Sequence, residues 1–184
     1  MFQRERFIED CRQAANDGQR AIQDLVADAV SDPQDVIAEL GEPSEACIQK
    51  LYCGTDLTIV NVVWAPFMSV MPHNHEIWAV IGVYRGAEDN IFWRRLEDGT
   101  VEAAGAKALR EGEVLPLGPD VVHSVTNPVD ELTAAIHVYG GDLYEIGRME
   151  WDAQDLTPHS HTTSRTLEVF AEANRRFQLA RQEA

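Results

Sequence analysis

Apolar residues recur at intervals of three and four in the first part of the chain, and at every second position further on. In the first fifty residues they form one stripe with charged residues between its members: Phe7, Cys11, Ala14, Gly18, Ile22 and Leu25. Because this spacing matches the period of a helix, it predicts amphipathic helices. The stretch "SDPQDVIAELGEP" predicts another short helix, with Ser31 or Asp32 as its N-cap and Gly41 at its end.

From Leu51 onward the pattern changes to short β-branched and aromatic runs such as "LTIVNVVWAP", "EIWAVIGVYRG" and "LTAAIHVYGGDL". Turn residues separate these runs at intervals of roughly ten residues, which is typical of an all-β sandwich or barrel. A helical period returns in "RTLEVFAEANRRFQLARQ", which Ser164 is placed to cap. The sequence therefore predicts a mainly β protein with an N-terminal helical extension (1–50), a β-barrel (51–150) and a C-terminal loop and helix (151–184).

Composition narrows the choice of partners and of compartment. The formal net charge of -16 argues against nucleic acid or an anionic membrane as a main partner, since both attract basic surfaces. Three scattered cysteines without CxxC spacing fit a reducing compartment. The N-terminal stretch has no apolar signal-peptide core, and no run approaches the roughly 18 apolar residues of a membrane span. We therefore expect a soluble, cytoplasmic protein.

The stretch "MPHNHEIWAV" places His73 and His75 two positions apart in a strand-like context. Side chains at i and i+2 of a strand share a face and lie about 7 Å apart, so both imidazoles can converge on one ion. Imidazole suits Fe, Zn, Ni and Cu. Taken alone, the pair is weak evidence for a metal site, and two surface or hydrogen-bonded histidines are the simpler interpretation.

A third histidine, His123, lies in "GEVLPLGPDVVHSVTNP", and the two stretches together resemble the two motifs of the cupin superfamily. In the first motif, His73, His75 and Gly86 fit. The second motif is matched, with spacings altered by one or two residues, at Gly112, Pro116, Gly118, His123 and Asn127. The resemblance implies a double-stranded β-helix, or jelly-roll barrel, in which His73, His75 and His123 bind a metal ion.

The chain departs from the first cupin motif in one informative way. Ala79 occupies the position at which that motif has a metal-binding Glu, and Glu76 would point to the opposite face of a regular strand. Three neutral ligands leave a divalent ion with its full charge and with roughly three open octahedral positions. Such a site suits an anionic co-ligand, such as a thiolate, together with dioxygen.

A further stretch, "TAAIHVYGG", places Ala135, His137 and Tyr139 on one face of a strand. Over roughly residues 50–145 the chain is similar to thiol dioxygenases of the cysteine dioxygenase type, which are cupins with three-His iron and a Ser-x-His-x-Tyr motif. Ala135 replaces the serine here. The resemblance implies that Tyr139, hydrogen-bonded to His137, orients the substrate or dioxygen. Without the resemblance, His137 and Tyr139 would be interpreted as ordinary core residues.

The residues expected to contact substrate differ from those of cysteine dioxygenases. No arginine stands in the upstream region "KLYCGTDL", and there is no cysteine after Cys53 to cross-link to the tyrosine. We expect Trp78 to shape the cavity and Arg85 to supply a cationic group, unless its charge is simply solvated. A second histidine pair, His159 and His161, lies outside the predicted barrel and is not expected to bind metal.

The resemblance implies a mononuclear non-haem iron(II) dioxygenase that adds both atoms of O₂ to the sulfur of a small thiol and gives a sulfinate. The same three histidines would also accept Zn, Ni or Mn. Two alternatives remain open: a zinc centre of the hydrolase type, with an open fourth position, and a non-catalytic metal-bound cupin that binds a small molecule as a sensor. The helical flanks either seal the barrel or support a homodimer.

Overall fold

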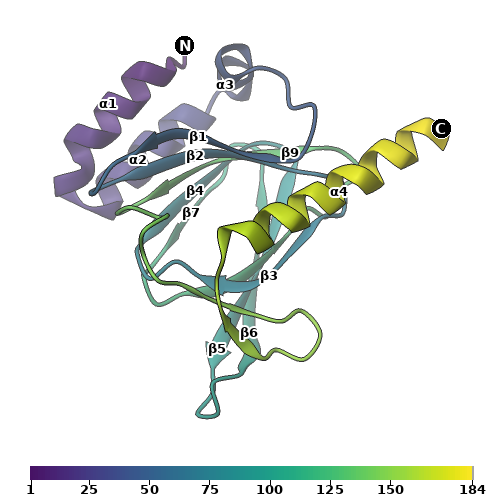
Figure 1. Cartoon of the computed structure of the whole chain (residues 1–184). Helices are drawn as coiled ribbons and strands as arrows, with labels where there is room; N and C mark the ends of the chain where they lie inside the picture. The colour runs from purple at the N-terminus through teal and green to yellow at the C-terminus, as the bar shows by residue number, and fades with distance from the viewer. Residues whose placement is uncertain (184) are drawn as a thin grey trace.

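The computed structural model describes residues 1–183, in which two antiparallel β-sheets face each other and helices lie at both ends of the chain (Figure 1). The helices are α1 (Arg4–Ala14), a 3-10 turn η1 (Ala15–Asp17), α2 (Gln19–Val30), α3 (Pro33–Leu40) and α4 (Thr163–Glu183). The strands are β1 (Cys47–Cys53), β2 (Thr58–Trp64), β3 (Ser69–Asn74), β4 (Ala79–Arg85), β5 (Ala87–Arg95), β6 (Val101–Arg110), β7 (Val114–Leu117), β8 (Val122–Thr126), β9 (Thr133–Tyr139), β10 (Met149–Trp151) and β11 (Pro158–Ser160). Among the described residues, no helix is both long enough and apolar enough to cross a membrane.

The order of the strands is that of a double-stranded β-helix. One sheet has the order β1-β2-β9-β4-β7 and the other the order β11-β10-β3-β8-β5-β6. Along the chain, β2, β3, β4 and β5 alternate between the two sheets, and β7, β8 and β9 do so again. This alternation winds the chain around a shared interior, as in a jelly roll. The predicted fold class is confirmed.

The first sheet is buried on both faces, because the N-terminal helices cover its outer side. In β2, Ile59 and Val63 pack outward against the helices, whereas Val60 and Val62 point into the barrel. Figure 1 shows these helices against the sheet that contains β1, β2 and β4. Two covered faces explain why β2 and β9 read as nearly continuous apolar runs.

Several predicted boundaries differ from the structure. The N-terminal stripe is divided between α1 and α2, because the 3-10 turn η1 follows α1 and Gly18, with φ 88, ends that turn before α2 begins. Strand β1 begins at Cys47, so residue 51 falls inside a strand. Helix α4 begins at Thr163, one residue before the predicted cap. Asp32 and Gly41 do flank α3 as predicted.

Close packing of α2 on β4 depends on a glycine. A Cβ atom at Gly82 would lie 2.4 Å from Val26 Cγ1 and 3.0 Å from Val30 Cγ1. We therefore expect Gly82→Ala to lower the free energy of unfolding by about 1–3 kcal/mol, as overpacking of a core does. Urea denaturation measures this loss. The matched control is Gly105→Ala on β6, where the nearest atom would be 3.9 Å away; an equal loss in both variants would contradict the packing argument.

In Figure 1 the C-terminal helix α4 runs across the barrel toward the upper right, away from α1 and α2. Its residue Phe170 is 4% exposed and joins the core of the barrel interior. The ring of Phe170 stacks on Trp64 with centroids 5.4 Å apart. Helix α4 therefore forms part of the wall of the interior cavity.

Candidate metal centre

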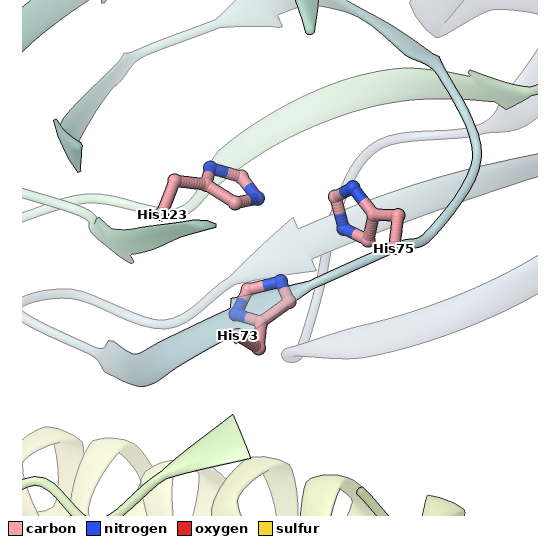
Figure 2. Close-up of side chains that lie close together, drawn as sticks. All are labelled: His73, His75 and His123. Atoms are coloured by element: carbon pink, nitrogen blue, oxygen red, sulfur yellow. The ribbon is translucent and has the colours of Figure 1, made fainter. Parts of the chain in front are cut away.

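Three histidines converge inside the barrel, as Figure 2 shows. His73 on β3 and His123 on β8 are directly opposite each other in the antiparallel ladder, so their side chains share a face. His75 follows one residue after the end of β3. One nitrogen from each ring can be chosen so that all three lie within 4.8 Å of one another. The predicted trio is thus brought together by strand pairing.

The three rings have the protonation state and orientation that a metal ion requires. Burial lowers the pKa of His73 to about 4 and holds the pKa values of His75 and His123 well below the ordinary value. The rings are therefore neutral at pH 7, with lone pairs to donate. Nδ1 of His73 lies 2.9 Å from the Met71 carbonyl oxygen, and Nδ1 of His123 lies 2.7 Å from Asn90 Oδ1. Buried Nε2 of His123 has no hydrogen-bond partner among the described residues, so this donor set fits a divalent metal.

Among residues 1–183, no carboxylate joins these histidines in the cluster. Ala79, at the position of the motif's glutamate, is fully buried and has no group to coordinate an ion. Glu76 instead accepts a hydrogen bond from Asn74 and pairs with Arg95 at 3.2 Å. The site is a three-His site, as the departure at Ala79 predicts.

A cavity of about 90 Å³ adjoins the histidines and holds the predicted tyrosine and histidine of β9. His137 and Tyr139 both point into it, and the Tyr139 hydroxyl lies 3.0 Å from His137 Nδ1. The Tyr139 ring is 5.0 Å from that of His75, centroid to centroid. Burial lowers the pKa of His137 to about 3 and raises the pKa of Tyr139, so both side chains are neutral at pH 7.

Behind the histidines lies a buried carboxylate that the sequence analysis did not identify. Glu88 on β5 is 0% exposed and accepts hydrogen bonds from Trp64 Nε1 at 3.2 Å and from Asn90 Nδ2 at 3.0 Å. Its Oε2 atom is 3.8 Å from His137 Nε2. Burial raises the pKa of Glu88 to about 7. Alternation on "GAEDNIF" was an available signal, because it places two polar residues, 88 and 90, on the face of Phe92.

The C-terminal segment contributes polar groups to the same cavity. Arg148, Tyr144 and His161 all line it. The backbone N–H of His161 donates to the Arg148 carbonyl oxygen at 2.9 Å, which ties the two segments together. Burial lowers the pKa of His161 to about 4, and its Nε2 lies 2.9 Å from Thr166 Oγ1. His161 thus belongs to the wall of the cavity, whereas its neighbour in the second HxH pair, His159, is exposed.

The structure corrects the two predicted substrate-pocket residues. Alternation along β4 turns Ala79 and Ile81 into the barrel, so Trp78 packs on the outer side with the N-terminal helices. A Cβ atom at Gly140 would lie 2.0 Å from the Trp78 ring, which shows how closely this indole is enclosed. Arg85 follows a bulge in β4 and pairs with Glu42 at 2.5 Å. Neither side chain lines the cavity at the histidines.

No protein-family model matches the chain. Among solved structures, it is similar to a protein with a double-stranded β-helix domain from Klebsiella pneumoniae, with 17% identity over 59% of this chain and 83% of that one and a TM-score of 0.48. A similar likeness, with 12% identity and a TM-score of 0.47 over 55% of this chain and 85% of the other, is to an RmlC-like cupin family protein from Methanocaldococcus jannaschii. Oxalate oxidase in complex with the substrate analogue glycolate matches at 14% identity over 54% of this chain and 53% of its own length, with a TM-score of 0.42. At these identities the likenesses concern the fold alone.

Proposed function

We propose that the chain is an iron(II)-dependent dioxygenase that converts a small thiol bearing a carboxylate into its sulfinate. One observation carries the proposal: a single small cavity joins three neutral histidines, a buried tyrosine paired with a histidine, and a half-buried arginine. Each feature has a separate task in thiol oxidation. The likeness to thiol dioxygenases in the motifs supports the same conclusion.

His73, His75 and His123 would hold the metal, for which their neutral imidazoles are suited. A bound divalent ion would lower the pKa of a thiol and hold thiolate and dioxygen next to each other. The apolar walls of the cavity, which include Val60 and Val125, limit the access of water. A cavity of about 90 Å³ restricts the substrate to a few heavy atoms beyond those at the metal.

Arg148 supports a substrate that carries a carboxylate. Arg148 lines the cavity, and among the described residues no carboxylate forms an ion pair with it, since the nearby Glu150 pairs with Arg165 at 3.0 Å. Burial lowers the pKa of Arg148, so an anion nearby would stabilise its charge. Arginine binds carboxylates through paired, charge-assisted hydrogen bonds. In a chain of net charge -16, this local cation is what an anionic substrate would require.

Tyr139 is placed to orient the substrate. Tyr139 lines the cavity with its hydroxyl 3.0 Å from His137 Nδ1, and burial keeps the phenol neutral. A hydroxyl in that position forms hydrogen bonds with a small ligand without adding a charge that would repel a thiolate or a carboxylate. Together with Arg148, it would fix the two ends of a short substrate.

The test is oxygen uptake by protein reconstituted with iron(II) under anaerobic conditions. We expect uptake with one of cysteine, 3-mercaptopropionate or mercaptosuccinate, matched mole for mole by sulfinate, and weaker uptake with cysteamine, which has no carboxylate. The control is the same protein after removal of iron by a chelator. Tight iron binding with no uptake on any thiol would contradict the proposal and favour a small-molecule sensor; hydrolytic activity of the zinc form would favour a hydrolase.

A further inference from the structure

We propose that Glu88 is a positioning residue that sets the tautomers of both His123 and His137, and so directs one lone pair to the metal and one to Tyr139. The inference rests on the proposed metal-dependent function, because it assigns the control of that site. Glu88 lies on β5, outside the motifs that contain the three histidines, and two side chains of the cavity wall, Trp64 and His137, face it.

Glu88 is surrounded by hydrogen-bond donors. Trp64 Nε1 carries a proton in every state of the indole and donates to Oε2 at 3.2 Å. The Asn90 amide donates to Oε1 at 3.0 Å, and His137 Nε2 faces Oε2 at 3.8 Å. An ionised carboxylate can only accept hydrogen bonds, so it suits all three neighbours at once. These hydrogen bonds favour the ionised form against the effect of burial on its pKa.

The first branch runs through Asn90 to the metal ligand. Because the NH₂ group of Asn90 is directed to Glu88, its oxygen is directed away, and Oδ1 lies 2.7 Å from His123 Nδ1. An oxygen in that position accepts a hydrogen bond, so Nδ1 of His123 carries the proton. Its Nε2 atom then has a free lone pair, and this atom is buried without a partner among the described residues. A lone pair at Nε2 is what metal binding requires.

The second branch runs through His137 to the tyrosine. Nε2 of His137 is buried, has no hydrogen-bond partner within residues 1–183, and has the Glu88 carboxylate as its nearest acidic group. A proton at Nε2 is attracted to that carboxylate, which leaves Nδ1 as an acceptor. Tyr139 then donates its hydroxyl proton to Nδ1 over 3.0 Å. The oxygen lone pairs of Tyr139 therefore face the cavity, where they can accept a hydrogen bond from substrate.

Glu88→Gln keeps the shape of the side chain but introduces an amide NH₂ among these donors. If the NH₂ replaces Oε1, Asn90 must turn over and present its own NH₂ to His123, whose proton moves to Nε2. If the NH₂ group replaces Oε2, it faces Trp64 and His137. Because the NH₂ group donates, Nε2 of His137 must then accept, and the His137 proton moves to Nδ1. Each orientation therefore inverts one histidine tautomer. A purely structural role for Glu88 would invert neither.

The experiment is a long-range ¹H–¹⁵N correlation spectrum of the metal-free full chain at pH 8, which reports which nitrogen of each histidine is protonated. We expect His123 as the Nδ1–H form and His137 as the Nε2–H form in the wild type, and inversion of at least one in E88Q. Co²⁺ titration of the same samples follows metal affinity. If His123 inverts, we expect the dissociation constant to rise about 10- to 100-fold, the range for loss of an outer-shell partner.

Two further variants make the outcome decisive. Asn90→Ala removes the first branch and one donor to Glu88 but leaves Trp64 and His137 beside Oε2, so His137 should remain the Nε2–H form while the Nδ1–H signal of His123 loses its protection. Glu111→Gln, which changes an exposed carboxylate, should alter neither the tautomers nor the Co²⁺ affinity.

Wild-type tautomers opposite to those expected, or E88Q spectra and Co²⁺ affinity equal to those of the wild type, would overturn the proposal. If E88Q does not fold, the wild-type and Asn90→Ala spectra still decide it. None of these measurements needs a thiol, so they stand apart from a failure of the dioxygenase proposal.

Discussion

His123→Ala is expected to abolish stable metal binding and, with it, thiol-dependent oxygen uptake. His123 is 1% exposed and supplies one of only three ligand nitrogens in the cluster. Two imidazoles cannot compensate for the third, because Ala79 leaves no carboxylate nearby. We expect the dissociation constant for iron(II), measured by anaerobic equilibrium dialysis, to rise by more than about 100-fold, the upper end for loss of an outer-shell partner.

The matched control for this variant is His159→Ala. His159 belongs to the second HxH pair of the chain, but it is exposed on β11 and lies outside the metal cluster. It should leave iron binding unchanged. Far-UV circular dichroism of both metal-free variants separates loss of the ligand from loss of the fold. Unchanged iron affinity in a folded His123→Ala protein would show that these three histidines do not form a metal site.

Arg148→Gln is expected to change the choice of substrate with little effect on oxidation of an uncharged or cationic thiol. A hydrogen bond to a charged group contributes about 1.5–3 kcal/mol, which corresponds to a change in affinity of about 10- to 150-fold. We therefore expect KM for the preferred carboxylated thiol to rise by that factor, and KM for cysteamine to stay within about twofold. The reason is that Arg148 is the arginine that the structure places in the wall of the cavity.

Arg85→Gln is the control for Arg148, because Arg85 pairs with Glu42 away from the cavity. It should leave both KM values unchanged. A second measurement does not require turnover: 3-mercaptopropionate should protect metal-loaded wild-type protein from thermal unfolding, and protect Arg148→Gln much less. Equal losses on carboxylated and amine thiols would show that Arg148 supports the fold of the cavity rather than the binding of a carboxylate.

Local patterns in the sequence were sufficient for much of the fold and, together with the resemblance to the cupin motifs, for the three candidate metal ligands. Alternation at every second position predicted that Ala135, His137 and Tyr139 share a face, and the structure places the last two in the cavity. The HxH spacing predicted the convergence of His73 and His75. The same alternation, continued one residue before β4, turns Trp78 outward together with Val80, away from Ala79 and Ile81.

Contacts between distant segments were decided only by the tertiary structure. Arg148 reaches the cavity from the segment between β9 and β10, where no periodic pattern indicates which way a side chain points. The proposed role of Glu88 and Asn90 depends on their contacts with residues of other strands, namely Trp64, His123 and His137. Hydrogen-bond direction in a buried network depends on all partners together, and those partners come together only when the two sheets close around the interior.

Local periods in the sequence determined most of the elements and the shared face of His73 and His75, and the resemblance to the two cupin motifs added the jelly-roll class and His123 as the third candidate ligand. Only the tertiary structure decided which charged groups face the cavity. The neighbours of a charged residue in the sequence do not determine where its side chain lies. Its position depends on the cost of desolvation and on which partner the tertiary fold brings close to it. Arg85 finds Glu42 outside the barrel, and Arg148 lies at the site itself.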